Sequence, residues 1–408
     1  MAYEDTAFRR KSDDGDDPVA YRTGTGAADY RNRRLDSDGD GPAEPPRRSA
    51  DDDARDRMGI HLGWEIVLLL AVAAIGYLLY RLDPTALRRP ALDTLLITGT
   101  SIGLLTLGAG LTLRAGVPNL ALGPIALAGA LHYAEQGDRG LLDAALPALG
   151  LAAAGGLLVG LLIFGLHVPA WAATLGAGMG VVVYDQLRTA PVQVQGTYDP
   201  SDQAFYLFGG FALVAVVGAA LGSLPPVRRV IGRMRPVGDP AVRRGGAAAL
   251  PVIATMVVSS VFAAAAGILM AAQSAEPIRP GTGLEWTGIA VGTALFAGTS
   301  AFGRRGGVFG TLLAVAGVTL FLDYTERRGL DISLFAVAAA LIGAGLVVTR
   351  LVETYGRPLP VGVAEEEWTG SAAAGTTWKP DLPESWSPSV PTQNRSDRWD
   401  DGPWGTSR

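Results

Sequence analysis

Side chains that could carry out covalent chemistry are few and scattered in this 408-residue chain. Cysteine is absent, which excludes disulfides, thiolate nucleophiles and cysteine-ligated metal sites. His132 and His167 stand at the ends of predicted helices, where a solvated interfacial histidine is commoner than a proton relay. Paired carboxylates, metal-spaced histidines and nucleophile–base sets are not evident in the apolar part of the sequence. We therefore expect no enzyme activity, no metal site and no cofactor.

Charged groups are equally sparse in the apolar segments. Five carboxylates occur there, each near a predicted helix end: Glu65, Asp93, Asp143, Asp185 and Asp323. Ion-coupled carriers usually need buried acids or histidines to relay protons or cations, and none is evident. Lysine occurs only at Lys11 and Lys379, without the glycines of a nucleotide-binding P-loop. The chain therefore cannot supply a P-loop ATPase of its own.

Apolar segments dominate the middle of the chain and must position the polar groups that remain. About 18 apolar residues in a helix cross a hydrocarbon core of about 30 Å, and such stretches recur from Trp64 to Val352. We predict an all-α, polytopic membrane protein with about ten transmembrane helices. The predicted segments are 64–80, 92–113, 117–133, 141–164, 169–186, 204–224, 248–273, 286–302, 307–323 and 332–352. Of these, 117–133 and 286–302 are short enough to be broken or re-entrant helices inside the protein.

Polar tails flank this membrane domain, which we place at residues 64–355. Residues 1–63 are rich in Asp, Arg and Gly and cannot bury enough apolar surface to offset chain entropy, so we predict a disordered tail. Residues 356–408 carry five of the eight tryptophans among Pro, Ser, Gly and acids, which also favours disorder. Because indole rings favour membrane interfaces, this second tail either stays unstructured or lies along the bilayer or on a partner.

Arginine indicates the orientation in the membrane. The loop 225–247 holds six arginines against one acid, so the positive-inside rule makes it cytoplasmic, and counting ten spans outward from it makes both termini cytoplasmic. The same count places four further arginines inside, as the rule prefers: Arg114, Arg304, Arg305 and Arg350. It places five outside, against the rule: Arg81, Arg88, Arg89, Arg327 and Arg328.

Glycines recur at four-residue spacing, which lets helix backbones approach closely in lipid. The pairs are Gly99/Gly103, Gly156/Gly160, Gly176/Gly180 and Gly306/Gly310. We interpret them as helix-packing positions, although a gate or a solute path would use the same residues. A faint repeat also pairs Arg-Ala-Gly-Val at 114–117 with Arg-Gly-Gly-Val at 305–308. Because transporters are often built from duplicated halves with the solute site between them, we predict two pseudo-repeated halves.

A glycine-rich motif late in the membrane domain carries a resemblance to a known family. Residues 281–311 resemble the late signature of bacterial permeases that import ribose, xylose and related sugars. In that family a Gly-x-Gly-x-Glu loop precedes an Ile-Ala helix, a Gly-Thr-Ser stretch, a basic glycine turn and a Gly-Thr-Leu helix. The matching positions here are Gly281, Gly283, Glu285, Ile289, Ala290, Gly298, Thr299, Ser300, 304–307, Gly310, Thr311 and Leu312.

Two earlier stretches agree with this resemblance, which covers roughly residues 92–355. Pro169 followed by Thr174-Leu-Gly is similar to the family's Pro-x-x-x-x-Thr-Leu-Gly helix start. Residues 119–123 stand where sugar permeases carry an Asp-Leu-Ser-Val-Gly-like turn, and residues 114–119 resemble the related nucleoside permeases more closely. The family as a whole comprises ABC-transporter permeases for sugars, nucleosides and branched-chain amino acids.

The resemblance implies the membrane-spanning permease subunit of an ATP-binding-cassette importer, which moves a neutral sugar or nucleoside-like solute across the bacterial plasma membrane. It implies three partners besides the lipid bilayer, namely a separate ATPase subunit, an extracellular solute-binding protein and a second, identical or similar permease subunit. Nucleic acid is not an expected partner. The expected substrate path comprises Asn119, Thr174, Glu285, Thr299 and Ser300. For Asn119, Thr299 and Ser300, the alternative role is to cap loose helix ends.

The stretch expected to dock on the ATPase departs from the family pattern. The family carries a short helix in its main cytoplasmic loop, but here Pro240, Gly245 and Gly246 weaken helix formation and only fragments of the pattern remain. The predicted coupling residues are Gly238, Asp239, Ala241, Arg243 and Arg244. This departure keeps a second hypothesis open, a non-transporting membrane scaffold derived from such a permease. A membrane enzyme is a weaker third.

Overall fold

The computed structural model describes residues 58–224, 227, 249–300 and 307–356. Within them the chain forms ten α-helices and two short 3-10 helices, η2 (Gly137–Arg139) and η3 (Pro200–Gln203), and no strand beyond an isolated bridge. The α-helices are α1 (Met58–Leu82), α2 (Ala91–Ala115), α3 (Leu122–Gln136), α4 (Leu141–Gly165), α5 (Ala170–Gln186), α6 (Ala204–Ser223), α8 (Ala249–Gln273), α9 (Leu284–Phe296), α10 (Gly310–Arg327) and α11 (Leu334–Gly356). Each predicted segment overlaps one of these helices, which confirms the all-α prediction.

Six of the described helices are long and apolar enough to cross a membrane, namely α1, α2, α4, α6 with η3, α8 and α11. Large apolar side chains stand on their outer surfaces. Leu151 of α4 is 69% exposed and Leu213 of α6 is 64% exposed. Apolar surface of this extent on helices of this length is suited to lipid and not to water. The chain is therefore a multi-pass membrane protein, as predicted, although six helices and not ten meet the length and composition of a span.

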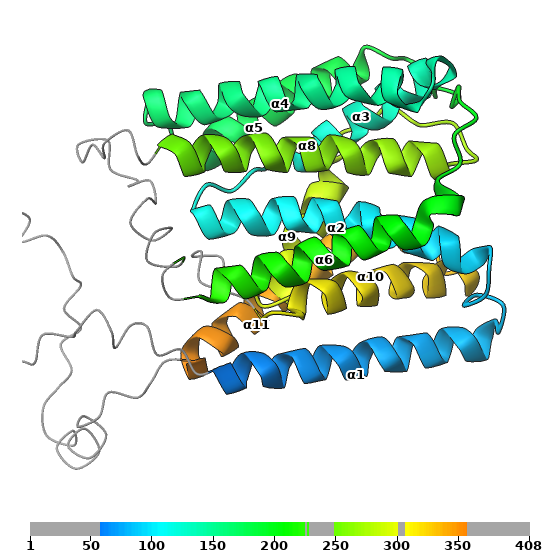
Figure 1. Cartoon of the computed structure of the whole chain (residues 1–408), viewed down its shortest axis with the longest axis vertical. Coiled ribbons are helices and arrows are strands. Elements are labelled where there is room, and N and C mark those ends of the chain that lie inside the picture. The colour runs from blue at the N-terminus through cyan, green and yellow to red at the C-terminus, as the bar shows by residue number, and fades with distance from the viewer. Residues whose placement is uncertain (1–57, 225–226, 228–248, 301–306, 357–408) are drawn as a thin grey trace, which may run out of the picture. The chain divides into compact units, whose positions relative to one another are not determined.

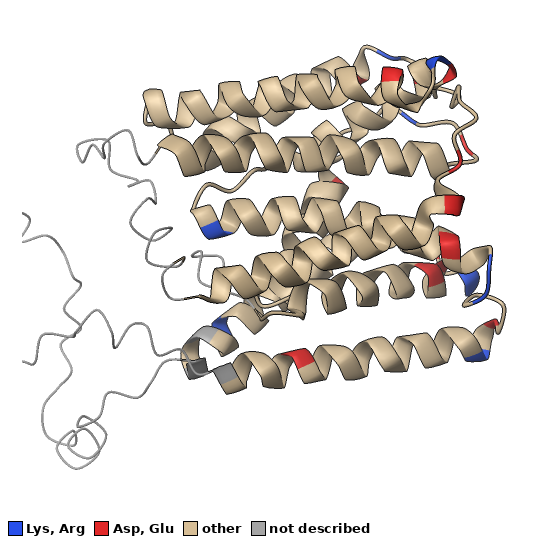
Figure 2. Ribbon diagram, in the orientation of Figure 1, with Lys and Arg blue, Asp and Glu red and all other residues tan. Residues whose placement is uncertain are grey.

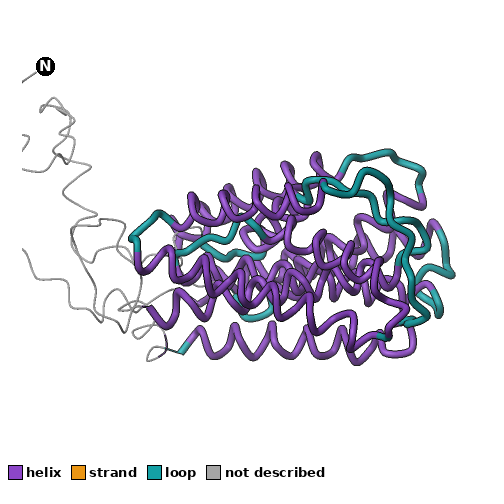
Figure 3. The backbone as a smooth tube through the Cα atoms, turned by 90° about the horizontal axis from the view of Figure 1, so that it is seen from above, coloured by secondary structure: helices purple, strands orange, loops and turns teal. Residues whose placement is uncertain are grey.

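Two central helices, α3 with 15 residues and α9 with 13, are too short to cross a bilayer. At about 1.5 Å per residue they reach about 22 Å and about 20 Å, against a hydrocarbon core of about 30 Å. Irregular segments precede both, residues 117–121 before α3 and 274–283 before α9. Figure 3 shows loops running in among the helices as well as around their ends. The prediction of broken or re-entrant helices at these two places agrees with this arrangement.

The short helices run toward opposite ends of the bundle (Figure 1). We name the end at which α1 and α2 are connected the α1–α2 end. There α8 ends beside the start of α2, because Gln273 donates a hydrogen bond to the Thr94 carbonyl (3.2 Å). In contrast, α9 ends beside the start of α1, where Trp64 donates to the Phe296 carbonyl (2.9 Å). The segment before α9 therefore enters from the α1–α2 end, and the segment before α3 enters from the other end.

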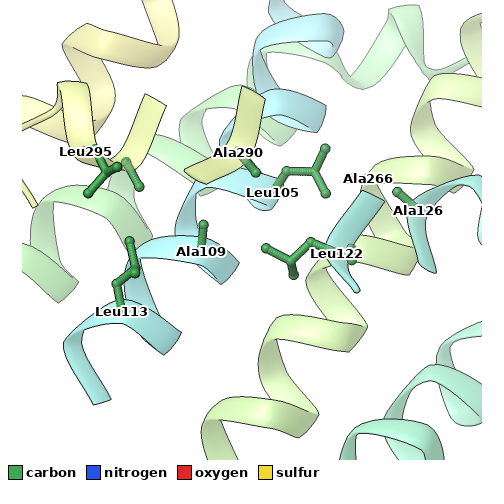
Figure 4. Packing of buried hydrophobic residues seen from close by; sticks show 10 residues of the cluster. Leu105, Ala109, Leu113, Leu122, Ala126, Ala266, Ala290 and Leu295 are labelled. Carbon is green, nitrogen blue, oxygen red and sulfur yellow. The ribbon is translucent and has the colours of Figure 1, made fainter. Parts of the chain in front are cut away.

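Alanine and leucine side chains from α2, α3, α8 and α9 form the central core (Figure 4). Its buried members are Leu105, Ala109, Leu113, Leu122, Ala126, Ala263, Ala266, Ala290, Ala294 and Leu295. Alanine adds little bulk, so the backbones of these helices come close together, as helices do when they pack in lipid. The two short helices, α3 and α9, therefore pack closely against α2 and α8 at the centre of the bundle.

Glycines bring α4 and α8 into backbone contact. A Cβ atom on Gly156 would lie 2.6 Å from the Met256 carbonyl oxygen, and one on Gly160 would lie 2.9 Å from the Cα of Ile253. Both distances are too short for a real side chain, so larger residues would push the helices apart. The helix-packing interpretation of this glycine pair is confirmed.

The remaining glycine pairs divide into two kinds. On α2, a Cβ atom on Gly103 would lie 2.5 Å from the Phe211 ring, so this glycine also leaves the space in which a side chain of a neighbouring helix, α6, packs. On α5, Gly176 and Gly180 have no described atom within 4 Å of a Cβ position. Gly306 lies outside the described residues. The packing interpretation therefore holds for α2 and α4, whereas the α5 pair, Gly176 and Gly180, packs on no other described part of the chain.

The short sequence repeat does not pair the two short helices. Residues 114–117 lead into α3, whereas residues 305–308, of which 307 and 308 are described, lead into α10. The element that matches α3 in length, in its preceding irregular segment and in its central position is α9, one helix earlier. The four-residue repeat is therefore not the trace of a correspondence between α3 and α9.

Most charged residues lie near the ends of the bundle (Figure 2). At the α1–α2 end, the Arg188 guanidinium pairs with both oxygens of Glu135 (2.6 and 2.8 Å), which raises the pKa of Arg188 above its ordinary value. At the same end, Arg327 of α10 pairs with Asp83 (2.6 Å) and with Asp323 (2.7 Å). These pairs join the segment after α5 to α3, and the α1–α2 connection to α10.

Acid is expected to loosen the α1–α2 connection. The hydroxyl and the amide of Thr85 donate hydrogen bonds to Asp83 (2.6 and 2.8 Å), and these bonds, together with Arg327, hold the pKa of the Asp83 carboxyl below its ordinary value. Stabilisation from a depressed pKa is complete above the unfolded-state value of about 3.9 and is lost as the pH falls through the folded-state value. We therefore expect the Thr85 amide to exchange with deuterium faster in acid, once intrinsic rates are corrected.

The matched variant for this experiment is Asp83→Asn, which should abolish the pH dependence. The effect should be small because the carboxyl is solvent-exposed and screened. Equal corrected exchange of the Thr85 amide on both sides of the titration in the unmodified protein would contradict the prediction.

Candidate functional site

The N-terminal ends of α3 and α9 meet inside the bundle. Thr287, in the first turn of α9, accepts a hydrogen bond from the Gly123 amide of α3 (2.8 Å) and donates one to the Leu120 carbonyl (3.2 Å). The Thr287 side chain is buried. We name this contact, formed by residues 117–123 and 283–287, the interior junction. One hydroxyl group thus links two discontinuous helices.

Two glycines allow this close approach. Gly283 has a left-handed backbone conformation (φ 65°), which favours glycine, and a Cβ atom there would lie 2.6 Å from the Gly123 carbonyl oxygen. A Cβ atom on Gly123 would in turn overlap the Gly283 carbonyl oxygen. Each glycine makes room for the backbone of the other helix. The sequence motifs include both glycines, but their contact appears only in the fold.

Asn119 fixes the irregular segment before α3. Its side-chain amide donates to the Ser259 hydroxyl of α8 (2.9 Å), and its side-chain oxygen accepts the Ala121 amide (3.0 Å). Its backbone amide donates to the Thr112 hydroxyl of α2 (3.4 Å). Backbone groups at membrane depth need such internal partners because no water replaces them. Asn119 thus satisfies the backbone of the irregular segment and does not cap α3 itself, whose N-cap residue is Ala121 and has no side-chain cap.

Thr174 holds the same segment from α5. Its hydroxyl lies 3.1 Å from the Pro118 carbonyl oxygen and 2.8 Å from that of Ala170, and its side chain is fully buried. One turn later, a Cβ atom on Gly178 would lie 3.3 Å from the Ala121 Cα. Residues 117–121 are thus fixed from α2, α5, α8 and α9 together.

The chain matches no protein-family model, no curated protein and no solved structure. The interior junction is therefore interpreted from its own geometry.

Glu285 is the charged residue of the interior junction. It stands in the first turn of α9, two residues before Thr287, and is partly buried. Within the described residues its carboxylate has no hydrogen-bond or ion-pair partner. The N-terminal end of a helix carries a partial positive charge, which stabilises a carboxylate placed there. This carboxylate can accept hydrogen bonds from a solute that reaches the junction.

The predicted substrate path does not form one site. Asn119, Thr174 and Glu285 lie in or against the interior junction. Thr299 and Ser300 are buried beyond the opposite end of α9, a helix about 20 Å long. Whether a solute passes both places stays a prediction. The predicted coupling residues, all within 238–244, lie outside the described part of the chain.

Sequence analysis missed two hydroxyl residues that build the junction, Thr287 and Ser259. Thr287 stands within the quoted motif, two residues after Glu285, but nothing in the motif marks it as a link to α3. Ser259 lies in the middle of an apolar helix, where a serine ordinarily bonds its own backbone, as this one also does to Met256 (3.1 Å). The signal that could have found both is a hydroxyl residue inside an apolar helix that adjoins an irregular segment in the sequence.

The junction contains groups that form hydrogen bonds. Its side chains offer hydroxyls, one amide and one carboxylate. Within the described residues, no group of three or more His, Asp or Glu side chains is placed to hold a metal ion. Hydroxyl and amide groups exchange hydrogen bonds readily with a polar neutral molecule, which is a binding role.

Removal of either partner is expected to weaken the bond between Asn119 and Ser259. We expect Asn119→Ala and Ser259→Ala each to lower the unfolding free energy by about 1–2 kcal/mol. The double variant should lose less than the sum, by about 0.5–1.5 kcal/mol, because both changes remove the same bond. Unfolding of the full chain in mixed detergent measures these values. Ser223→Ala, at the exposed end of α6, is the control, and strictly additive losses would contradict a direct bond.

Proposed function

We propose that this chain is the membrane-spanning permease subunit of an ATP-binding-cassette importer for a neutral sugar or nucleoside-like solute. The observation that carries the proposal is the interior junction, where two discontinuous helices meet N-terminal end to N-terminal end. Transporters commonly bind their solute where two such broken helices from related halves meet. The chain performs no covalent chemistry in this proposal, and a separate subunit hydrolyses ATP.

The order of the helices supports two pseudo-repeated halves. In α2 to α5 and again in α8 to α11, a long helix comes first and a short helix follows after an irregular segment. Helix α8 runs opposite to α2, and α9 runs opposite to α3 (Figure 1). This order is that of an inverted repeat, in which the interior junction would lie on the axis that relates the halves.

The groups at the junction favour a neutral solute. Two helix N-terminal ends bring partial positive charge, and Glu285 brings a negative charge among them. These charges offset each other, so the electrostatic field at the junction strongly favours neither an anion nor a cation. The hydroxyls of Thr287 and Ser259 and the amide of Asn119 are engaged within the junction. The Glu285 carboxylate is therefore the side chain that can accept hydrogen bonds from the hydroxyl groups of a sugar.

The orientation of the proposed importer follows from its arginines. By the positive-inside rule, the end that carries Arg114 and the start of α1 faces the cytoplasm of a bacterial plasma membrane, as do both termini. The ATPase subunit would bind there. The α1–α2 end would face outward and receive solute from an extracellular binding protein, and a second permease subunit would complete the importer.

Co-purification tests this proposal. The full chain, affinity-purified from its native membrane in mild detergent, should bring an ATPase subunit and a solute-binding protein with it, both identified by mass spectrometry. Membrane vesicles that contain the complex should take up solute only with ATP. Good recovery of the chain with neither partner would contradict the importer and support the membrane scaffold.

A further inference from the structure

Glu65 lies further inside the membrane domain than its expected place near a helix end. Helix α1 begins at Met58, six residues before its predicted start, so Glu65 is its eighth residue. The Glu65 side chain is 8% exposed. Burying a carboxylate in an apolar helix is costly unless it is hydrogen-bonded. Its partners should therefore show why it is there.

Glu65 binds the start of α10. Its Oε1 accepts hydrogen bonds from the backbone amides of Phe309 (2.6 Å) and Gly310 (3.1 Å). The first amides of a helix have no partner within the helix, and at membrane depth water does not supply one. A carboxylate at this end also interacts favourably with the helix dipole. Helix α1 thus caps a helix that lies more than 240 residues later.

The preceding residue, Trp64, binds the end of α9. Its indole N–H donates to the Phe296 carbonyl (2.9 Å), and its ring packs edge to face on the Phe296 ring, with 5.6 Å between centroids. Two neighbouring residues of α1 therefore satisfy the last turn of one helix and the first turn of the next. We name this contact the α1 anchor, formed by Trp64 and Glu65 with Phe296, Phe309 and Gly310.

Two glycines lie beside the anchor, Gly298 after α9 and Gly307 before α10. Gly298 has a left-handed backbone (φ 90°), and a Cβ atom there would lie 3.6 Å from the Trp64 ring. A Cβ atom on Gly307 would overlap the Glu65 carboxylate. The glycines of the late motif are thus explained in part by contact with α1.

The anchor and the interior junction hold opposite ends of one helix. Helix α9 has 13 residues, with Thr287 bonded to α3 near its start and Phe296 bonded to Trp64 at its end. Along its length it packs on α11, where a Cβ atom on Gly292 would lie 2.8 Å from the Cβ of Leu341. This packing contact sets the distance between α9 and α11. The hydrogen bonds at the two ends of α9 fix its position along its own axis.

We infer that Trp64 and Glu65 are positioning residues for the interior junction: by fixing the end of α9 and the start of α10, they fix the N-terminal end of α9 against α3. Neither residue contacts the junction. The importance of this device for solute transport rests on the proposed function, whereas its structural effect does not.

Single-cysteine reporters test the inference, because the chain has no cysteine of its own. Gly281→Cys, two residues before the junction, reports on it, because its Cβ would make an ordinary contact of 3.8 Å with Leu127 of α3. Phe309→Cys reports on the anchor, at a side chain that is 49% exposed. The rate of maleimide labelling of the full chain in lipid nanodiscs is measured with and without changes at Glu65.

Glu65→Ala should speed labelling at both reporters by about tenfold or more, because two amides lose their partner. Glu65→Gln should restore slow labelling, since the glutamine side-chain oxygen can accept the same bonds. Leu69→Ala, an exposed change one turn further along α1, is the control and should leave both rates unchanged. Faster labelling at position 309 alone would overturn the inference and make the anchor a purely local cap.

A milder variant keeps the test decisive if Glu65→Ala does not fold. Trp64→Phe retains an aromatic ring against Phe296 but removes the N–H donor and part of the ring, so it should speed labelling at position 281 severalfold. No change at position 281 in a folded Trp64→Phe protein would also count against the inference. The experiment needs neither solute nor ATPase, so its failure and a failure of the proposed importer are distinguishable.

Discussion

Thr287→Val is expected to break the interior junction and to lower the unfolding free energy by about 2 kcal/mol. Valine matches threonine in shape but has no hydroxyl, so the Gly123 amide and the Leu120 carbonyl both lose their partner, at 2.8 and 3.2 Å. Both are backbone groups at membrane depth, where water does not replace a lost bond. The variant therefore leaves two unsatisfied groups and no change in packing.

Thr287→Ser provides the matched comparison, because it keeps the hydroxyl and removes only a methyl group. Unfolding of both full-length variants in mixed detergent should rank serine close to the unmodified protein and valine well below it. If the proposed function is correct, uptake should follow the same order. A valine variant as stable as the serine variant would show that this hydroxyl does not hold the two helices together.

Gly267→Ala should be more damaging still. A Cβ atom on Gly267 of α8 would overlap the Ala126 carbonyl oxygen of α3. Because the obstacle is backbone, no side-chain rotation relieves the overlap, and α3 must move away from α8. Overpacking costs about 1–3 kcal/mol where side chains can adjust, and more where backbones must shift. We expect a loss of about 3 kcal/mol or more and a sharp fall in the yield of folded protein.

Gly110→Ala is the control for this change. Gly110 also lies within a helix, α2, but has no atom within 4 Å of its Cβ position. Alanine there should be neutral or stabilising by up to about 1 kcal/mol, since it favours the helix over glycine. Size-exclusion chromatography after heating measures both variants. Equal melting of Gly267→Ala and Gly110→Ala would contradict the backbone contact between α3 and α8.

Hydropathy predicts the helices well because a lipid-facing helix needs a long apolar run, and every such run is visible in the sequence. Hydropathy fails where the residues are apolar but the backbone is not helical. The segment 117–133 was predicted as helix from its start, but Pro118 and Asn119 lie in an irregular stretch and α3 begins at Leu122. Likewise 286–302 is apolar throughout, yet α9 ends at Phe296 because Gly298 takes a left-handed conformation.

The contacts of the candidate site could not be predicted, for a different reason. Thr287 and Gly123 are 164 residues apart, and Glu65 and Gly310 are 245 apart. Which polar groups meet depends on how far each helix is shifted along its neighbour, and a single sequence does not specify that shift. The motifs therefore marked Gly283 and Gly310 without indicating what each makes room for, and Glu65 stood outside every motif.

A bilayer around this protein meets helices of unequal length. The surface helices α1 and α4 have 25 residues each, about 38 Å, whereas α5 has 17, about 26 Å. Against a hydrocarbon core of about 30 Å, the long helices must tilt or project, and the bilayer must thin around the short one. A thicker membrane would therefore relieve α1 and α4 while it strains α5, and a thinner one would do the reverse.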